Sequence, residues 1–340
     1  MQVYSNYEKL SNNACINIQH MVNYALFIQN ENGEHIKMKP KIFIDGQEGT
    51  TGLQIHNRLV DRNDIELLSI EEALRKDICE KKRLINQADL VILCLPDVAA
   101  RESVSLINND KTKVIDASTA HRTNADWVYG FAELSQEQYS KIKNSKRVAN
   151  PGCHSTGIIA SVFPLISQNI MPNNYPITCM SITGYSGGGK SMINAYENEK
   201  TTAMYAPRIY ALELNHKHLP EIMYVTGLTA KPLFCPIVDD YYNGLATTVA
   251  LHNHSLPGSP TAECIHKVLV DHYKGQKFVS VAPELGSGML ECNWGAGTDN
   301  MEITVSGNDD QTIITARFDN LGKGASGAAV QNMDIMLELS

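Results

Sequence analysis

The chain has 340 residues, of which 43% are hydrophobic and 19% charged, and it carries 29 Lys and Arg against 37 Asp and Glu. The formal net charge of −8 offers no basic field that would attract nucleic acid. The sequence shows no N-terminal signal segment and no apolar run approaching about 18 residues, so we expect neither secretion nor a membrane span. A globular cytoplasmic protein with room for two ordinary domains is the expectation.

The cysteines do not follow the spacing of a metal site or a disulfide framework. There are eight of them, and none lies in a C-x-x-C pair or a tight cluster. We therefore expect reduced thiols and no bound metal. The positions are Cys15, Cys79, Cys94, Cys153, Cys179, Cys235, Cys264 and Cys292.

Residues 1–37 differ from the rest of the chain. They are rich in Asn, Gln and Tyr and lack a sustained amphipathic period, and a strand pattern begins abruptly after Met38. We interpret residues 1–37 as an N-terminal extension outside the fold, with Met38 as an alternative start of the natural chain.

From Lys41 onward, short apolar runs alternate with helix-length segments of mixed polarity. Alternation of buried strands and helices predicts an α/β fold with a Rossmann-like, doubly wound parallel sheet. The predicted strands are 41–45, 65–69, 89–96, 113–118 and 147–151.

After about residue 175 the strand-like runs become longer and helix candidates become rare. This sequence pattern predicts a second, α+β domain built on a mixed or antiparallel sheet. The strand-like runs are 177–183, 245–252, 278–282, 300–307 and 312–319. The predicted helices are at about 190–204, 261–274 and 324–339.

The segment "DGQEGTTG" places Gly46, Gly49 and Gly52 between a predicted strand and a predicted helix. Glycine lets backbone amides approach a phosphate, and a helix N-terminus favours negative charge. The spacing is G-x-x-G-x-x-G rather than the commoner G-x-G-x-x-G, and a tight strand-to-helix turn is the alternative. In this strand-helix-strand context we favour dinucleotide binding.

The end of the second predicted strand bears on which dinucleotide is bound. An NAD site usually has an acidic residue there, whereas this chain has Ser69. A hydroxyl with Arg75 nearby suits a 2′-phosphate, although Glu71 and Glu72 lie between them. We therefore predict NADP rather than NAD.

Cys153 follows an Asn-Pro-Gly turn in the segment "VANPGCHSTG". Apolar residues recur at helical spacing from Ile158, which predicts a helix from near Ser155 that Pro164 kinks or ends. Helix N-termini lower the pKa of a thiol, so we predict a nucleophilic thiolate rather than a buried small hydrophobe. Asn150, on the same turn, is our candidate for oxyanion stabilisation together with the Cys153 amide.

The segment "ELNHKHLPEI" offers a proton-transfer partner for the thiol. Two histidines at i and i+2, such as His216 and His218, can point to one side of an extended segment, where Glu221 can orient one ring. Pro220 indicates a rigid loop. We interpret the segment as catalytic, with surface polarity or an incidental core histidine as the alternative.

Five segments, in this order, resemble those of the N-acetyl-gamma-glutamyl-phosphate reductases of the shorter type: "DGQEGTTG", "DASTAHR", "ANPGCHSTG", "HKHLPEI" and "DNLGKGASGAAVQN". The resemblance runs from about Met38 to the C-terminus. It implies an NADPH-dependent oxidoreductase similar to aspartate-semialdehyde dehydrogenase. The implied reaction reduces N-acetyl-L-glutamyl 5-phosphate to N-acetyl-L-glutamate 5-semialdehyde and phosphate, in arginine biosynthesis.

The resemblance also implies roles for individual residues. Cys153 matches the nucleophile that carries the acyl group as a thioester, and His218 matches the acid/base. His216 is its neighbour and Glu221 an orienting group. The residues assigned to the cofactor are Gly46, Gly49, Thr50, Thr51, Gly52, Ser69, Arg75, Leu95, Pro96, Ser118, Gly187 and Asn320.

The same resemblance implies a division into domains. The final helix returns to the nucleotide domain, so residues 38–152 and 321–340 bind NADP and residues 153–320 form the catalytic and oligomerisation domain. Arg122 and Lys190 lie in segments suited to binding the phosphate or carboxylate of the substrate. A homo-oligomer, dimer or tetramer, is expected.

Three other interpretations remain open from the sequence. A related enzyme that reduces an N-succinyl-glutamyl, aspartyl or carrier-bound aminoadipyl phosphate would use the same chemistry. A non-catalytic NADP-binding redox sensor would oxidise Cys153 reversibly, but a sensor needs no acid/base partner. A zinc protein would use Cys153, His154, His216 and His218.

Overall fold

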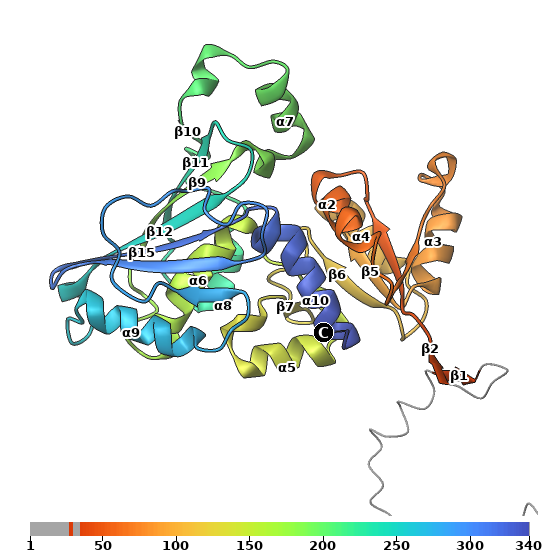
Figure 1. Ribbon diagram of the computed structural model, residues 1–340, viewed down its shortest axis with the longest axis horizontal. Coiled ribbons are helices and arrows are strands. Elements are labelled where there is room, and N and C mark those ends of the chain that lie inside the picture. Colours follow the sequence, from red (N-terminus) through yellow and green to blue (C-terminus); the bar gives the residue numbers. More distant parts are fainter. Residues whose placement is uncertain (1–26, 30–34, 340) are drawn as a thin grey trace, which may run out of the picture. The chain divides into compact units, whose positions relative to one another are not determined.

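A parallel sheet forms the first half of the fold in the computed structural model, which describes residues 27–29 and 35–339 (Figure 1). Its strand order is β4-β3-β5-β6-β8-β7, and all neighbours pair in parallel. The predicted doubly wound sheet is therefore confirmed. Its strands are β3 (Lys41–Asp45), β4 (Glu66–Leu68), β5 (Leu90–Leu93), β6 (Lys113–Asp116), β7 (Val128–Tyr129) and β8 (Arg147–Ala149).

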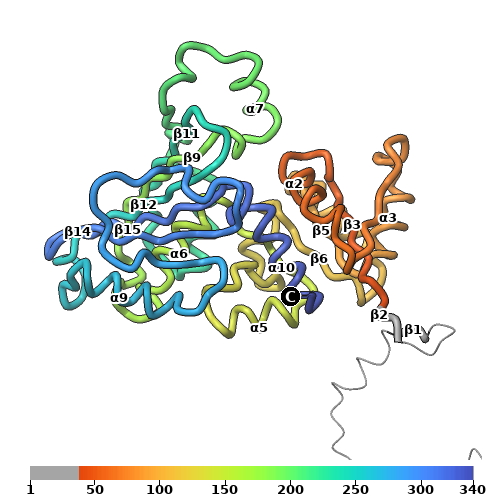
Figure 2. The backbone as a smooth tube through the Cα atoms, in the orientation of Figure 1, coloured from red at the N-terminus to blue at the C-terminus, as the bar shows by residue number. Residues whose placement is uncertain are grey.

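The central strands of this sheet are buried on both sides, because helices pack their apolar faces against it. The last helix, α10 (Gly327–Leu337), comes from the far end of the sequence but packs here, against α2, α5 and β6 (Figure 2). Lys113 Nζ donates to the carbonyl of Met336 at 2.6 Å, and Arg62 pairs with Asp334 at 2.6 Å. The other elements are α2 (Thr50–Leu59), η1 (Glu72–Leu74), α3 (Ile78–Gln87), α4 (Asp97–Ser105), η2 (Ala132–Leu134) and α5 (Gln136–Asn144).

A mixed sheet forms the second half of the fold, as the sequence predicted. Its order is β10-β11-β9-β12-β15-β14-β13. The pairs β11 with β9 and β13 with β14 are parallel, and the other neighbours are antiparallel. The strands are β9 (Thr178–Gly184), β10 (Arg208–Ile209), β11 (Leu233–Asp239), β12 (Leu245–His252), β13 (Val279–Val281), β14 (Met301–Gly307) and β15 (Gln311–Phe318).

Helices cover one face of the mixed sheet. Residues of α6 and α9 contact β12, β14 and β15 and share one apolar core with the sheet. On the opposite face, the outer face hereafter, Met180 is 43% and Ile313 44% exposed. The helices are α6 (Cys153–Ser167), α8 (Leu219–Thr226) and α9 (Ala262–Tyr273).

A projecting arm follows β9 (Figure 1). The chain turns at η3 (Tyr185–Gly188), forms α7 (Gly189–Glu197) and ends in η4 (Thr202–Tyr205), so the single helix predicted for 190–204 is broken in two. The short η5 (Asn253–Ser255) follows β12, and η6 (Gly322–Ser326), a π-helical turn, precedes α10. None of the described helices is both long and apolar enough to cross a membrane.

Two elements that the sequence analysis missed, β11 and α8, contain prolines. Pro236 lies in β11, which the sequence analysis missed, just beyond the two residues with which β10 pairs. Pro220 begins α8 instead of stiffening a loop, because the first turn of a helix does not need the missing N–H. The predicted rigid loop after His218 is therefore wrong.

Pro164 lies inside α6, which continues to Ser167. The sequence predicted that Pro164 would kink or end the helix, and the structure shows that it does not end it. A proline at this position leaves the carbonyl of Ala160 without its helical donor. The hydroxyl of Tyr273, on α9, donates to that carbonyl at 2.8 Å.

The N-terminal segment contains an antiparallel pair, β1 (Phe27–Gln29) with β2 (His35–Lys37). Residues 1–40 form a unit separate from residues 41–340. The remaining expectations for residues 1–37 lie outside the described residues.

Replacing Tyr273 with Phe should lower the free energy of unfolding by about 1–3 kcal/mol, because the buried Ala160 carbonyl loses its donor. Urea denaturation followed by circular dichroism measures this loss. In a Pro164→Ala background the restored N–H can donate to the same carbonyl, so the cost should shrink. An equal cost in both backgrounds would contradict the assignment.

Candidate active site

Cys153 is the first residue of α6, directly after the N-cap Gly152. The turn that leads to it follows β8, at the carboxyl edge of the parallel sheet. The thiol lines a cavity of about 210 Å³, the thiol cavity hereafter. The cavity is lined by Cys153, His154, Thr183, Gly184, Gly187, Gly188, Met192, Tyr210, His216, Lys217, His218 and Val238.

The electrostatics of the thiol differ from the prediction. Burial raises the pKa of Cys153, and the nearby Glu221 carboxylate raises it further. The backbone N–H of His154 and the charges of Arg122 and Lys217 act in the opposite direction but do not overcome burial. The helix N-terminus is present as predicted, but the thiol is predominantly protonated near neutral pH rather than a preformed thiolate.

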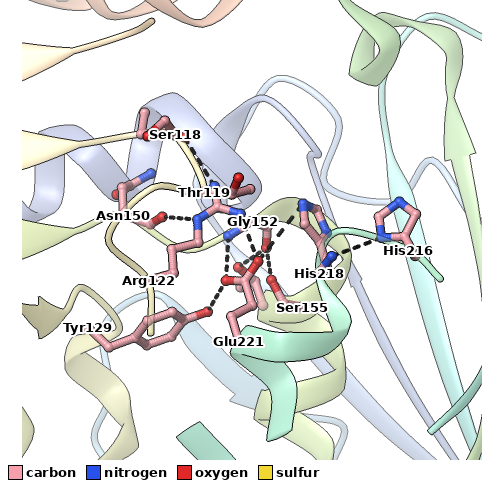
Figure 3. A network of polar contacts seen from close by, with 12 residues as sticks. Ser118, Thr119, Arg122, Tyr129, Asn150, Gly152, Ser155, His216, His218 and Glu221 are labelled. Atoms are coloured by element: carbon pink, nitrogen blue, oxygen red, sulfur yellow. Dashed lines mark hydrogen bonds and ion pairs between the residues drawn. The ribbon is translucent and has the colours of Figure 1, made fainter. Parts of the chain in front are cut away.

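A buried carboxylate organises the residues beside the thiol (Figure 3). Glu221 Oε1 accepts a hydrogen bond from Arg122 Nη1 at 2.7 Å. Its Oε2 accepts from the Tyr129 hydroxyl at 2.8 Å and from the Gly152 N–H at 3.2 Å. A Cβ on Gly152 would lie 2.5 Å from both Arg122 Nη1 and His218 Nε2, so only glycine fits this N-cap.

The two predicted histidines meet at the thiol cavity. Burial lowers the pKa of His218 well below its ordinary value and that of His216 to about 4, so both rings are neutral near pH 7. His218 Nε2 lies 3.9 Å from Glu221 Oε1, beyond hydrogen-bond distance. Its Nδ1 is buried without a partner among the described residues, whereas His216 Nδ1 accepts from the backbone N–H of His218 at 3.2 Å.

Asn150 and Arg122 are not placed as the sequence analysis expected. The Asn150 side chain donates to the carbonyl of Ala325 at 2.9 Å and accepts from Asn332 at 3.1 Å, so it faces α10 and does not line the thiol cavity. Arg122 Nε donates to the carbonyl of Asn150 at 2.9 Å, and Nη2 donates to that of Ala117 at 3.1 Å. With Nη1 on Glu221, every guanidinium nitrogen bonds the protein.

Three lining residues or network members, Lys217, Tyr129 and Tyr210, were missed from the sequence, and His154 was named there only as a candidate zinc ligand. His154 contacts Ser181 and Tyr210, and Lys217 lies exposed between the two predicted histidines. Tyr129 bonds Glu221. The positions of His154 and Lys217, each adjacent to a predicted catalytic residue, were the available signal; Tyr129 and Tyr210 had none.

The glycine loop has the geometry of a nucleotide site. Gly46 has φ of 89°, and a Cβ there would lie 2.3 Å from the Cys94 carbonyl oxygen. A Cβ on Gly52 would lie 2.3 Å from the Gly46 oxygen. The hydroxyl of Thr50, at the start of α2, is buried without a partner in the described part of the chain. These features fit a phosphate at the helix N-terminus.

Two cavities adjoin the glycine loop. One, of about 300 Å³, is lined by Gly46, Gly49, Ser69, Arg75 and Leu95, among others. The other, of about 410 Å³, is lined by Gly49, Thr50, Thr51, Cys94, Leu95, Ala117, Gly189 and Lys190. Lys190 therefore lies at the nucleotide loop, not at the thiol. In the first cavity Arg75 Nη2 pairs with the exposed Glu48 at 2.9 Å.

Three expected cofactor residues bond to the protein itself. The Ser118 hydroxyl donates to Asp116 at 2.7 Å, and Pro96 is the N-cap of α4. Asn320 Nδ2 donates to the Ser186 hydroxyl at 2.9 Å, and its Oδ1 accepts from the backbone N–H of Gly244 at 2.8 Å. Asn320 thus holds the turn that brings Gly187 into the thiol cavity. Within the described residues, no three His, Cys, Asp or Glu are placed to hold a metal ion.

Comparison with solved structures agrees with this architecture. Aspartate-semialdehyde dehydrogenase II from Vibrio cholerae, complexed with ASA, superposes with a TM-score of 0.69 at 14% identity, over 89% of this chain and 99% of that one. The enzyme from Francisella tularensis superposes with a TM-score of 0.65 at 13% identity, over 87% and 99%. At these identities the likeness establishes the fold.

Sequence comparison establishes the family. Residues 34–142 match the NAD binding domain of semialdehyde dehydrogenases, and residues 153–320 match their dimerisation domain. The chain is 48% identical to N-acetyl-gamma-glutamyl-phosphate reductase 2 of Nostoc sp. over 314 residues, 88% of this chain and 98% of the relative. It is 48% identical to the reductase of Sinorhizobium medicae over 308 residues, 88% and 99%. The chain therefore belongs to the N-acetyl-gamma-glutamyl-phosphate reductase family of semialdehyde dehydrogenases.

Proposed function

We propose that this chain reduces N-acetyl-L-glutamyl 5-phosphate to N-acetyl-L-glutamate 5-semialdehyde and phosphate, through a thioester on Cys153, in arginine biosynthesis. The observation that carries the proposal is the thiol at a helix N-terminus, in one cavity with His218 and in the same compact unit as the glycine loop. We infer the acyl group of the substrate from the names of the relatives. Succinylated, aspartyl and aminoadipyl phosphates are the competing substrates, and each belongs in the first substrate panel.

Because the thiol and the imidazole are both neutral, the first step has to include transfer of the thiol proton to the imidazole. As sulfur attacks the carbonyl carbon, His218 accepts the thiol proton, the C–O bond to phosphate breaks and phosphate departs. Bound reduced nicotinamide supplies the hydride that converts the thioester into the aldehyde. The imidazolium then returns its proton to the sulfur that leaves. Glu221, 3.9 Å from His218, stabilises the imidazolium while it exists.

The cavity also contains a cation for the anionic substrate. Lys217 is exposed and lines the thiol cavity, and its charge acts on Cys153 and on the neighbouring histidines. We assign the substrate phosphate or carboxylate to Lys217 in place of Arg122, because each guanidinium nitrogen of Arg122 already donates a hydrogen bond within the protein. Asn150 becomes a residue that fixes the turn before Cys153, and the oxyanion contact passes to the α6 N-terminus.

The domain match indicates a nicotinamide cofactor, and we propose NADP. Ser69 and Arg75 line the same cavity as the glycine loop. Arg75 pairs with an exposed carboxylate, Glu48, which a 2′-phosphate can replace as its partner. Lys190 completes the site on the other side of the loop. Equal kcat/KM values for NADPH and NADH would contradict this proposal.

The outer face supports a homo-oligomer. Met180 and Ile313 expose apolar side chains on the outer face of the sheet, within the region that matches the dimerisation domain. We propose that two chains associate through this face, as a dimer or as half of a tetramer, in the cytoplasm. Sedimentation of the purified chain as a monomer at micromolar concentration would exclude the contact.

Wild-type protein supplied with N-acetyl-glutamate semialdehyde, NADP and phosphate should form NADPH, and Cys153→Ser should form it at least roughly a thousandfold more slowly, because the hydroxyl is a far weaker nucleophile. Absorbance of NADPH measures the rate. Cys264→Ser, at an exposed cysteine, is the matched control. Phosphate-dependent turnover that survives Cys153→Ser would overturn the mechanism.

The alkylation of Cys153 by iodoacetamide should rise with pH through a midpoint above about 8.5, the ordinary thiol value. Burial raises the pKa of this thiol, so the reactive thiolate becomes abundant only at alkaline pH. Mass spectrometry of the Cys153 peptide over a pH series gives the midpoint, with the exposed Cys79 as internal control. A midpoint well below that of Cys79 would mean a preformed thiolate instead.

Replacing Lys217 with Met should raise the KM for one anionic substrate by roughly 10-fold or more with a smaller change in kcat, since a charge-assisted contact is lost. Separate KM values for phosphate and for the semialdehyde distinguish a phosphate contact from a carboxylate contact. Lys231→Met, on the loop before β11, serves as the charge-matched control. Unchanged KM values for both substrates would remove Lys217 from the substrate site.

A further inference from the structure

Three side chains beside the thiol form a hydrogen-bonded row that the proposed mechanism does not use. Ser181, fully buried on β9, lies 2.7 Å from His154 Nδ1. His154 Nε2 lies 2.7 Å from the hydroxyl of Tyr210, which follows β10 and lines the thiol cavity. His154 itself is the second residue of α6 and is buried. The row thus runs from the sheet interior to the cavity.

The need of each buried hydrogen-bonding group for a partner determines which atom of this row donates and which accepts. Among the described residues, the Ser181 hydroxyl has one recorded partner, His154 Nδ1. A buried hydroxyl proton without an acceptor is costly, so Ser181 donates and Nδ1 accepts. Burial lowers the pKa of His154 to about 3, so the ring stays neutral and carries its single proton on Nε2. That N–H donates to the Tyr210 oxygen.

The consequence concerns the proton of Tyr210. Because its oxygen already accepts from His154, the hydroxyl is left to donate elsewhere, and it lies at the thiol cavity. Burial raises the pKa of Tyr210, and the charge of a Cys153 thiolate raises it further, which places the two groups within electrostatic reach. The Tyr210 backbone N–H donates to the Pro236 carbonyl at 3.1 Å, which anchors the residue to β11.

We propose that Tyr210 is a further catalytic residue, whose hydroxyl donates a hydrogen bond to an oxygen of the bound substrate. Ser181 and His154 are positioning residues that fix the direction of this donor. The substrate oxygen is either the reacting acyl oxygen or the carboxylate. The inference rests on the proposed thioester chemistry but not on the identity of the acyl group.

The test uses two substrates, so that its failure and that of the proposed function are distinguishable. p-Nitrophenyl acetate acylates a thiol without cofactor, and it develops an oxyanion but has no carboxylate. If Tyr210 contacts the acyl oxygen, Tyr210→Phe should slow Cys153-dependent release of p-nitrophenolate by roughly 10- to 100-fold and lower kcat for the semialdehyde, as expected for loss of one oxyanion donor. Wild type without semialdehyde turnover would refute the proposed substrate and leave this first measurement intact.

A carboxylate contact gives a different result in the same variant. Ester acylation would stay at the wild-type rate, while the KM for the semialdehyde would rise with kcat nearly unchanged. Tyr224→Phe, at an exposed tyrosine on α8, is the matched control and should change neither quantity. If Tyr210→Phe changes neither the ester rate nor the semialdehyde kinetics, the proposal is overturned.

A double-mutant cycle tests the positioning residues. Ser181→Ala removes the donor that fixes the His154 tautomer, so it should reduce the parameter that Tyr210→Phe reduces. In the Tyr210→Phe background the same change should have little further effect, because no donor remains to be directed. Additive losses with a lowered melting temperature would show a merely structural role for Ser181 and overturn the relay.

Discussion

The ion pair of Glu221 with Arg122 is the interaction on which the arrangement of the site depends. Its partners come from segments far apart in sequence: Arg122 is 99 residues away, Tyr129 92 and Gly152 69. Removal of one member of such a buried pair generally costs about 3–5 kcal/mol, because the other charge stays buried and unpaired. The carboxylate therefore fixes the thiol-bearing turn to α8 and, through it, to the adjacent His218.

A neutral thiol suits the proposed substrate. N-acetyl-glutamyl phosphate carries a carboxylate and a phosphate, and a preformed thiolate would repel both. Burial keeps Cys153 protonated and His218 unprotonated, and no Asp or Glu is among the described residues that line the cavity. The exposed Lys217 can attract the anion before sulfur becomes charged. Proton transfer then coincides with bond formation, which confines the charged pair to the step that needs it.

The sequence predicted those features that depend on local pattern. Buried strands read as apolar runs, the glycine loop and the position of Cys153 at a helix start followed from spacing, and motif resemblance identified the family. Side-chain direction was not predictable, because the partner of Asn150 lies 175 residues away at Ala325, and Glu221, the ion-pair partner of Arg122, lies 99 residues away. The prediction of a lowered thiol pKa was wrong for a related reason. A helix start is visible in the sequence, whereas the burial that outweighs its effect is not.

The segment between β15 and α10 explains how the thiol is held relative to the cofactor sheet. Asn320 bonds the η3 turn and the chain before β12, while Gly324 in the π-helical turn lies so close that its Cβ would be 3.0 Å from that of Cys153. Two residues before α10, Ala325 accepts from Asn150, and α10 then packs on the parallel sheet. One continuous backbone thus contacts the mixed sheet, the thiol and the nucleotide-binding sheet in succession. The position of the thiol relative to the nucleotide-binding sheet is therefore fixed by this continuous segment and its close packing.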